Sequence, residues 1–336
     1  MGIINIIIAL LIFGIVVAVH EFGHFFVAKL NKITVHEFAI GMGPVIFQKE
    51  KNGTNYSLRA IPMGGFVAME GEDEESDDPN AFCQKNPLQK MAVIFAGPFM
   101  NFVLTIVTFI LLFTLSGVPV NKVGNIIENS PASKSELKVG DEIKSINGTN
   151  IKSWNDVPTT IAGTKGDVTL QVIRDGQTKE ITITPEEKNG RRTVGIYPMY
   201  EKNFSSSISQ AFSQTYSVSL SMLDFIKKLF TGKVDFNYVS GPVGIVKEMG
   251  SSVNSGLATV INYIAFISLN LGIMNLLPIP ALDGFRLLTS FVELITRKKL
   301  NKKMEYIVNA AGMIFLISIM LLVTYKDLIK IFIGNP

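Results

Sequence analysis

The chain has 336 residues, of which 47% are hydrophobic, and its mean hydropathy is +0.33. This composition is too apolar for an ordinary soluble protein and the length allows more than one folded unit, so we expect a membrane protein. The 31 basic and 28 acidic residues leave a formal net charge of +3, which is too balanced to indicate a nucleic-acid partner.

Four stretches contain the roughly 20 apolar residues that a helix needs to cross a bilayer. We expect membrane spans within residues 1–28, 91–116, 257–284 and 306–326. The first could be mistaken for a signal peptide, but it lacks a basic start and a small-residue cleavage site before His20, so we expect a retained helix. The predicted fold class is therefore a polytopic α-helical membrane protein with four transmembrane helices.

The segment after the first span, residues 29–90, combines strand patterns with an acidic run. Strand-forming residues at 37–47 and 55–69 are interrupted by glycines, which predicts a membrane-associated β-loop region on the cytoplasmic side. The acidic run at 70–78 is typical of a solvated linker.

A polar region separates the second and third spans. Its first part, residues 120–200, alternates short strand patterns with turn signals and predicts an inserted β-rich domain. These patterns lie at residues 123–128, 142–147, 168–174 and 179–184. The second part, residues 204–250, predicts an amphipathic helix along the membrane, followed by a connecting segment.

The distribution of lysine and arginine predicts the orientation. A basic cluster fills the loop expected at residues 285–305, and two lysines follow the first span directly; the residues concerned are Arg297, Lys298, Lys299, Lys302, Lys303, Lys29 and Lys32. Both loops should be cytoplasmic, which places the termini and the β-rich domain outside the cell. Lys326 and Lys330 weakly oppose this assignment.

The first span contains the motif H-E-x-x-H, formed by His20, Glu21 and His24. Residues four apart share one helix face, so the two imidazoles can bind one Zn²⁺ while the glutamate activates water as a general base. Because Cys83 is the single cysteine, any metal must be held by nitrogen and oxygen. Alternatively, these three residues lie at the membrane interface and only extend their polar groups toward water, without binding a metal.

The best candidate for a third metal ligand is Asp283, at the inner end of the third span. The first and third spans run in the same direction, so these ligands should reach the same depth. Pro278 and Pro280 break the helix there, and irregular backbone at membrane depth is tolerated only where it lines protein or a wet cavity. Alternatively, Asp283 caps the next helix.

These residues resemble the site-2 protease family of intramembrane zinc metalloproteases, in particular its regulator of sigma-E protease branch with a single PDZ domain. H-E-x-x-H in a first membrane helix pairs in that family with N-x-x-P-x-P-x-L-D-G in a later one, which matches residues 275–284 here. Further matching strings lie at residues 40–44, 61–66, 96–98 with Asn101, 240–244, and, for the PDZ core, 130–132, 137–143 and 146–148.

The resemblance implies one Zn²⁺ per chain, bound by His20, His24 and Asp283, with Glu21 as the catalytic base. It also implies that the β-rich domain is an extracytoplasmic PDZ-like domain. The implied substrates are single-span membrane proteins, such as anti-sigma factors or remnant signal peptides, cleaved in regulated intramembrane proteolysis. The implied location is the bacterial plasma membrane, with the active site near the cytoplasmic side.

Hydrolysis within a membrane helix requires an extended substrate, which a glycine-rich loop could bind as an added β-strand. Candidate substrate-binding residues are Gly41, Gly43, Gly64, Gly65, Phe66 and Asn275. The glycines could instead form ordinary turns. Asn275 could support a developing oxyanion or only a hydrogen bond between helices, and the second use is the one that we expect for Asn101.

Two other functions are consistent with part of the pattern. One is a quality-control membrane metalloprotease whose active site lies in a soluble domain, which the position of H-E-x-x-H inside an apolar span disfavours. The other is a catalytically idle membrane scaffold with a PDZ-like domain. The presence of Glu21 disfavours it, because a scaffold does not need a general base.

Overall fold

In a computed structural model of the chain, the described residues are 3–72, 74–188, 190–232, 241–252, 256–298 and 301–332. Ser240, part of one string that matches the family, and Lys299, part of the predicted basic loop, lie outside these ranges. The chain divides into two compact units. We call residues 1–111 with 211–336 the helical unit, and residues 112–210 the β-rich domain.

Four helices are long and apolar enough to cross a membrane. They are α1 (Ile3–Leu30), α2 (Pro87–Ser116), α6 (Leu257–Asn275) and α8 (Lys302–Phe332). Helix α6 ends at Asn275, nine residues before the end of the range expected for the third span. It stops there because Pro278 and Pro280 have no N–H for a helical hydrogen bond and their rings clash with the preceding turn.

The structure differs from the expected basic loop at residues 285–305. Most of this range belongs to α7 (Asp283–Thr296), a strongly amphipathic helix that ends at Arg297 in a left-handed conformation. Its apolar residues, such as Phe285, Leu288 and Phe291, recur at helical spacing. With 14 residues, α7 is too short to span a bilayer and instead extends the helical unit beyond α6.

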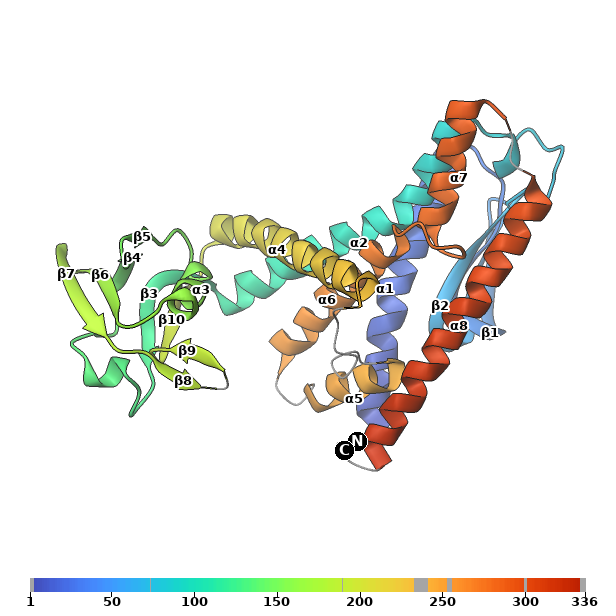
Figure 1. Ribbon diagram of the computed structural model, residues 1–336. Coiled ribbons are helices and arrows are strands. Elements are labelled where there is room, and N and C mark those ends of the chain that lie inside the picture. Colours follow the sequence, from blue (N-terminus) through green and yellow to red (C-terminus); the bar gives the residue numbers. More distant parts are fainter. Residues whose placement is uncertain are drawn as a thin grey trace. The chain divides into compact units, whose positions relative to one another are not determined.

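Strands β1 (Val35–Lys51) and β2 (Thr54–Met69) form a bent hairpin next to α1 (Figure 1). Asn52 and Gly53 both have positive φ, as a two-residue hairpin turn requires. Because the strands bend, Ile40 of β1 pairs with both Leu58 and Gly65 of β2. Among the described residues, the end of β2 from Gly65 to Met69 therefore has a strand on one side only and forms an outer edge.

Short helix α5 (Pro242–Ser252) is attached to the ends of the long helices. Its Met249 belongs to a buried cluster with Ala9 and Ile12 of α1. The N–H groups of Gly241 and Gly244, at the start of α5, donate to the two carboxylate oxygens of Asp327 in α8 at 3.2 and 2.7 Å. Asp327 is thereby buried with its charge satisfied by backbone donors.

The β-rich domain is built on an antiparallel sheet of six strands with the order β10-β3-β4-β6-β7, and β5 pairs with β4. Strands β3, β4, β6 and β7 overlap the four predicted strand patterns. The elements are β3 (Val118–Ile126), β4 (Glu142–Ile146), β5 (Thr149–Asn150), α3 (Asp156–Gly163), β6 (Val168–Arg174), β7 (Gln177–Ile183), β8 (Glu186–Lys188), β9 (Arg191–Thr193) and β10 (Ile196–Glu201).

Alternating residues of these strands point into one apolar core. Ile143, Ile146, Leu170 and Val172 are completely buried there, and Trp154 packs against the cluster. After this domain comes α4 (Phe204–Phe230), where the sequence predicts an amphipathic helix.

Candidate metal centre

Three side chains from two elements converge at one point of the helical unit. Nε2 of His20 lies 3.2 Å from Nε2 of His24 and 3.1 Å from Oδ2 of Asp283. Nε2 of His24 lies 3.4 Å from the same Asp283 oxygen. The structure thus brings the three predicted metal ligands together, and His20 is only 6% exposed.

Helix α1 presents the two histidines on one face because they are four residues apart. Their rings lie edge to face with centroids 4.8 Å apart. Asp283 comes from the first turn of α7, directly after the break that the two prolines impose. Gly284 allows this turn to close, since a Cβ there would lie 2.2 Å from the carbonyl oxygen of Leu277.

Hydrogen bonds on the far side of each ring orient the histidines. Nδ1 of His24 donates to the carbonyl oxygen of Val93 in α2 at 2.9 Å, which leaves Nε2 of the neutral ring as a lone-pair donor to a metal. Nδ1 of His20 lies 3.2 Å from the amide nitrogen of Asn101, also in α2.

The amide oxygen of Asn101 has no hydrogen-bond partner among the described residues, although the side chain is completely buried. The oxygen and nitrogen of an amide exchange places by a half-turn of the group. In the turned orientation the oxygen accepts the N–H of His20 Nδ1, and Nε2 keeps its lone pair for a metal. Asn101 therefore does form a bond between helices, as expected, but its partner is a candidate metal ligand.

The geometry of the three ligand atoms fits zinc. Tetrahedral zinc with bonds of about 2.0–2.2 Å has ligand atoms about 3.3–3.6 Å apart. The observed separations of 3.1, 3.2 and 3.4 Å are close to this range. Oδ2 of Asp283 is buried without a hydrogen-bond partner among the described residues, so three electron-rich atoms face one another, and a bound cation would satisfy them. Three protein ligands leave one position open for catalysis.

Gly97 in α2 makes room for this arrangement. A Cβ at this position would lie 2.2 Å from Nε2 of His24, the atom that would bind the metal. Gly23 has a similar role one residue before His24, where a Cβ would lie 2.3 Å from the carbonyl oxygen of Ala96. Helices α1 and α2 therefore touch along their backbones beside the histidines.

Glu21 lies in the same cavity as the two histidines. Gly65 of β2 lies next to it, since a Cβ at this position would approach Cγ of Glu21 to 3.3 Å. The outer edge of β2 therefore runs past the predicted catalytic base. Glu21 is therefore suitably placed to accept a proton from a group that binds between the outer edge of β2 and the metal centre.

The structure separates the predicted substrate-binding residues into two groups. Asn275 lies with its amide nitrogen 3.4 Å from Nε2 of His20, Gly65 adjoins Glu21, and Phe66 lines the cavity. The others, Gly41, Gly43 and Gly64, have positive φ and lie where the bent strands reverse. Their immediate role is to permit the bends.

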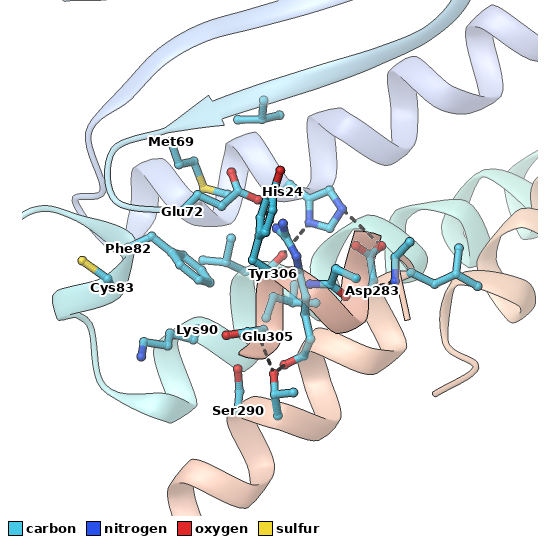
Figure 2. Close-up of a pocket in the computed structure, with 18 of the residues that line it drawn as sticks. His24, Met69, Glu72, Phe82, Cys83, Lys90, Asp283, Ser290, Glu305 and Tyr306 are labelled. Atoms are coloured by element: carbon cyan, nitrogen blue, oxygen red, sulfur yellow. Dashed lines mark hydrogen bonds and ion pairs between the residues drawn. The ribbon is translucent and has the colours of Figure 1, made fainter. Parts of the chain in front are cut away.

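The cavity has a volume of about 780 Å³ and extends from the metal centre to polar groups of α2, α7 and α8 (Figure 2). Lys90 in α2 pairs with Glu293 in α7 at 2.9 Å, and Arg286 in α7 pairs with Glu72. Glu72 belongs to the acidic run that the sequence suggests is a solvated linker. Part of this run therefore forms a wall of the cavity and holds α7 in place.

The chain is similar to known proteins along most of its length. A family model described as Peptidase family M50 matches residues 8–319. A candidate zinc metalloprotease of Clostridium acetobutylicum is 39% identical over 334 residues, which cover 98% of each chain. The regulator of sigma-W protease RasP of Bacillus subtilis is 32% identical over 420 aligned positions, with 98% of this chain and 100% of the relative covered. The crystal structure of the PDZ domain of an SdrC-like protein from Listeria innocua is 26% identical; the match covers 25% of this chain and 96% of that domain, with a TM-score of 0.22.

Proposed function

We propose that this chain, which belongs to peptidase family M50, the site-2 protease family, hydrolyses peptide bonds within the membrane-spanning segments of single-span proteins. The chain is a zinc metalloendopeptidase and a membrane protein with four apolar helices. The observation that carries the proposal is the position of the metal centre, because two of its three ligands lie in the apolar helix α1. Ionisable groups in such a helix are costly and mark functional sites.

The residues of the centre divide the chemistry between them. His20, His24 and Asp283 hold zinc, which supplies a Lewis acid for the hydrolysis of an amide. The carboxylate of Glu21 takes one proton from the attacking water and delivers it to the amine nitrogen as the C–N bond breaks. Asn275, beside His20, donates its amide N–H to the carbonyl oxygen on which negative charge develops.

A substrate helix must unwind before its peptide bonds become accessible, and its freed backbone groups then need partners. The outer edge of β2 offers unpaired backbone groups next to Glu21, so an extended substrate segment can add to it as a further strand. Replacing Gly65 with valine should abolish cleavage without loss of zinc, because the branched side chain would displace this edge from the carbonyl oxygen of Ala39 in β1 and fill the space beside Glu21.

The substrate class follows from membership of the family and from one relative. A relative of 32% identity carries the name regulator of sigma-W protease RasP. We therefore place the substrates of this chain among membrane-anchored anti-sigma factors or remnant signal peptides. The PDZ-like domain that we assign to residues 120–200 would bind or exclude parts of these substrates outside the membrane.

The orientation rests on the basic residues near the span ends. Lys29 follows the apolar part of α1, and Arg297 and Lys298 follow α7. Under the positive-inside rule these positions face the cytoplasm. The metal centre then lies near the cytoplasmic side of the bacterial plasma membrane, and both termini and the β-rich domain lie outside.

The proposal is tested by comparing the wild type with Glu21→Gln, which keeps the shape of the side chain but cannot accept a proton. Both proteins are purified in detergent and given a single-span reporter substrate, and zinc is counted per chain. We expect both to hold about one zinc and the variant to cleave about 10²–10⁴-fold more slowly. Undiminished cleavage by the variant would refute the role of Glu21, and failure of both proteins to hold zinc would refute the metal centre.

The two alternative functions are disfavoured. A membrane scaffold without activity is inconsistent with membership of a zinc metalloprotease family. A protease with its active site in a soluble domain is inconsistent with His20 and His24 lying inside an apolar helix of membrane-spanning length.

A further inference from the structure

The turn that carries Asp283 adopts an unfavourable backbone conformation. Ala281, two residues earlier, has a φ of 74°, in the left-handed region that residues with a Cβ avoid. Such a conformation is unfavourable and persists only when neighbouring groups hold it. Since Ala281 lies in the turn that leads into the predicted metal ligand, its conformation decides where the carboxylate of Asp283 lies.

A side chain of α8 holds this residue. The backbone N–H of Ala281 donates to Oδ1 of Asn309 at 3.1 Å, across 28 residues of sequence. Asn309 also lines the cavity that contains the metal centre, as do its helical neighbours Glu305 and Tyr306 (Figure 2).

A second contact fixes the same turn against α8. Gly312 lies one helical turn after Asn309, and a Cβ there would come within 2.4 Å of Cβ of Pro280. The backbone of α8 therefore packs directly against the proline that precedes Ala281. On its other side, the turn is confined by Gly284, which touches the carbonyl groups of Leu276 and Leu277.

We infer that Asn309 is a positioning residue of the metal centre: it holds Ala281 in the left-handed conformation and so places Oδ2 of Asp283 against the two histidines. The inference rests on the proposed role of Asp283 as a zinc ligand. Asn309 acts through the backbone of the turn, as groups that orient a ligand from behind do in other metal sites. Gly312 allows α8 to come close enough for this hydrogen bond.

The test measures zinc affinity of the full chain in detergent, by competition with a chromophoric chelator. We expect Asn309→Ala to bind zinc roughly 10–100-fold more weakly, the loss that follows removal of a group that orients a ligand. Asn309→Asp keeps an acceptor oxygen in the same place and should retain most of the affinity.

The decisive variant is Ala281→Gly combined with Asn309→Ala. Glycine adopts a positive φ without strain, so the turn no longer depends on the hydrogen bond for its conformation. We expect this double variant to recover most of the zinc affinity that Asn309→Ala loses. A purely structural role of Asn309 in α8 would not be rescued by a substitution in the turn.

Two further variants test whether a loss of zinc affinity is caused by a loss of folding. Gly312→Ala raises the helix propensity of α8 but crowds Pro280, so it should weaken zinc binding without loss of helix stability. Ser318→Ala removes an exposed hydroxyl of the same helix and should leave the affinity unchanged. The visible spectrum of the Co²⁺-substituted protein should change in Asn309→Ala and Gly312→Ala, since the position of the carboxylate changes.

Unchanged zinc affinity in Asn309→Ala would overturn the inference, and so would a loss that Ala281→Gly does not restore. Asp283→Ala separates this failure from failure of the proposed function. If Asp283→Ala binds zinc as well as the wild type, Asp283 is not a ligand and the proposed metal centre is wrong. If Asp283→Ala loses zinc and Asn309→Ala does not, only the role of Asn309 is wrong.

Discussion

The region around the metal centre and the β-rich domain are each stabilised internally by a different kind of packing. The β-rich domain has a continuous apolar core in which Leu170, Val172 and Ile143 are completely buried. Around the metal centre, polar groups such as His20 and Asn101 are buried instead, and each contacts a group on another helix. The first kind of packing depends on volume, and the second depends on the position of individual atoms.

This difference indicates which substitutions each region tolerates. An apolar core loses stability in proportion to the volume that a substitution removes, but its neighbours can partly adjust. A metal centre loses function when one ligand atom moves by about 1 Å, even if the fold survives. The following predictions test this comparison, beginning with the largest expected effect.

The sharpest test adds one methyl group beside the metal centre. Gly97→Ala places a Cβ only 2.2 Å from Nε2 of His24, so the ring must turn away from its partners. We expect at least about a 10²-fold loss of cleavage, as misplaced catalytic groups cause elsewhere. Zinc affinity, measured by competition with a chelator, should fall as well.

Gly163→Ala in the β-rich domain is the matched control, because a Cβ there meets no atom within 4 Å. We expect this variant to cleave and bind zinc like the wild type. Normal zinc binding by Gly97→Ala would show that the metal centre can adjust to an added atom as an apolar core does. The proposed difference between the two regions would then be wrong.

The second test removes volume from the apolar core. Leu170→Ala should lower the free energy of unfolding of the β-rich domain by about 2–5 kcal/mol, since it creates a cavity in a buried cluster. Trp154, the single tryptophan of the chain, packs against this cluster, so its fluorescence reports the unfolding. Zinc content should stay at the wild-type value; loss of zinc would mean that the two regions are not independent.

The third test concerns the buried ion pair of the β-rich domain. Nε and Nη2 of Arg174 donate to the two carboxylate oxygens of Asp141, each at 2.6 Å. Burial raises the pKa of Asp141, but the hydrogen bonds from Arg174 and from the backbone N–H of Lys138, together with the positive charge of Arg174, outweigh this effect and hold the pKa below its ordinary value of 3.8. The stabilisation is therefore present above pH 3.8 and is lost as the pH falls through the lowered pKa.

We expect Asp141→Asn to lower the free energy of unfolding by about 1–3 kcal/mol at neutral pH. Denaturation followed by Trp154 fluorescence between pH 7 and pH 3, as rough limits, should show an acid-dependent loss in the wild type that is smaller in the variant. An equal pH dependence of both proteins would assign the acid sensitivity to other carboxyl groups.

The smallest effect is expected at an exposed pair. Asp224 and Lys228 in α4 lie 2.7 Å apart, but both side chains are more than half exposed. Asp224→Asn should change the free energy of unfolding by less than about 0.5 kcal/mol and leave cleavage unchanged. A large effect on cleavage would show that α4 takes part in function through its charges.

The sequence predicts those parts of the site that depend on spacing within one element. His20 and His24 share a helix face because they are four residues apart, and the prolines of residues 278–280 explain why Asp283 follows a break. The sequence does not predict the short helix α7, because the basic residues that follow it, such as Arg297 and Lys298, are equally consistent with a cytoplasmic loop.

The contacts between elements could not be predicted in the same way. Nothing in the sequence links Asn309 to Ala281, because the left-handed conformation of an alanine leaves no compositional signal. Gly97 is unremarkable in an apolar helix until His24 is seen against it. The sequence predicts a hydrogen bond between helices for Asn101, but the partner is fixed only by the packing of α1 on α2.

Helix α8 is attached to the rest of the helical unit by polar groups near its two ends. Only 6% of its most apolar stretch is buried, so most of this helix is available to lipid. Asn309 and Asp327 are 18 residues apart, which corresponds to a rise of about 27 Å, close to the thickness of the hydrocarbon core. The spacing of the two attachments is thus close to the thickness of one bilayer core, so a membrane that is much thinner or thicker would strain both of them at once.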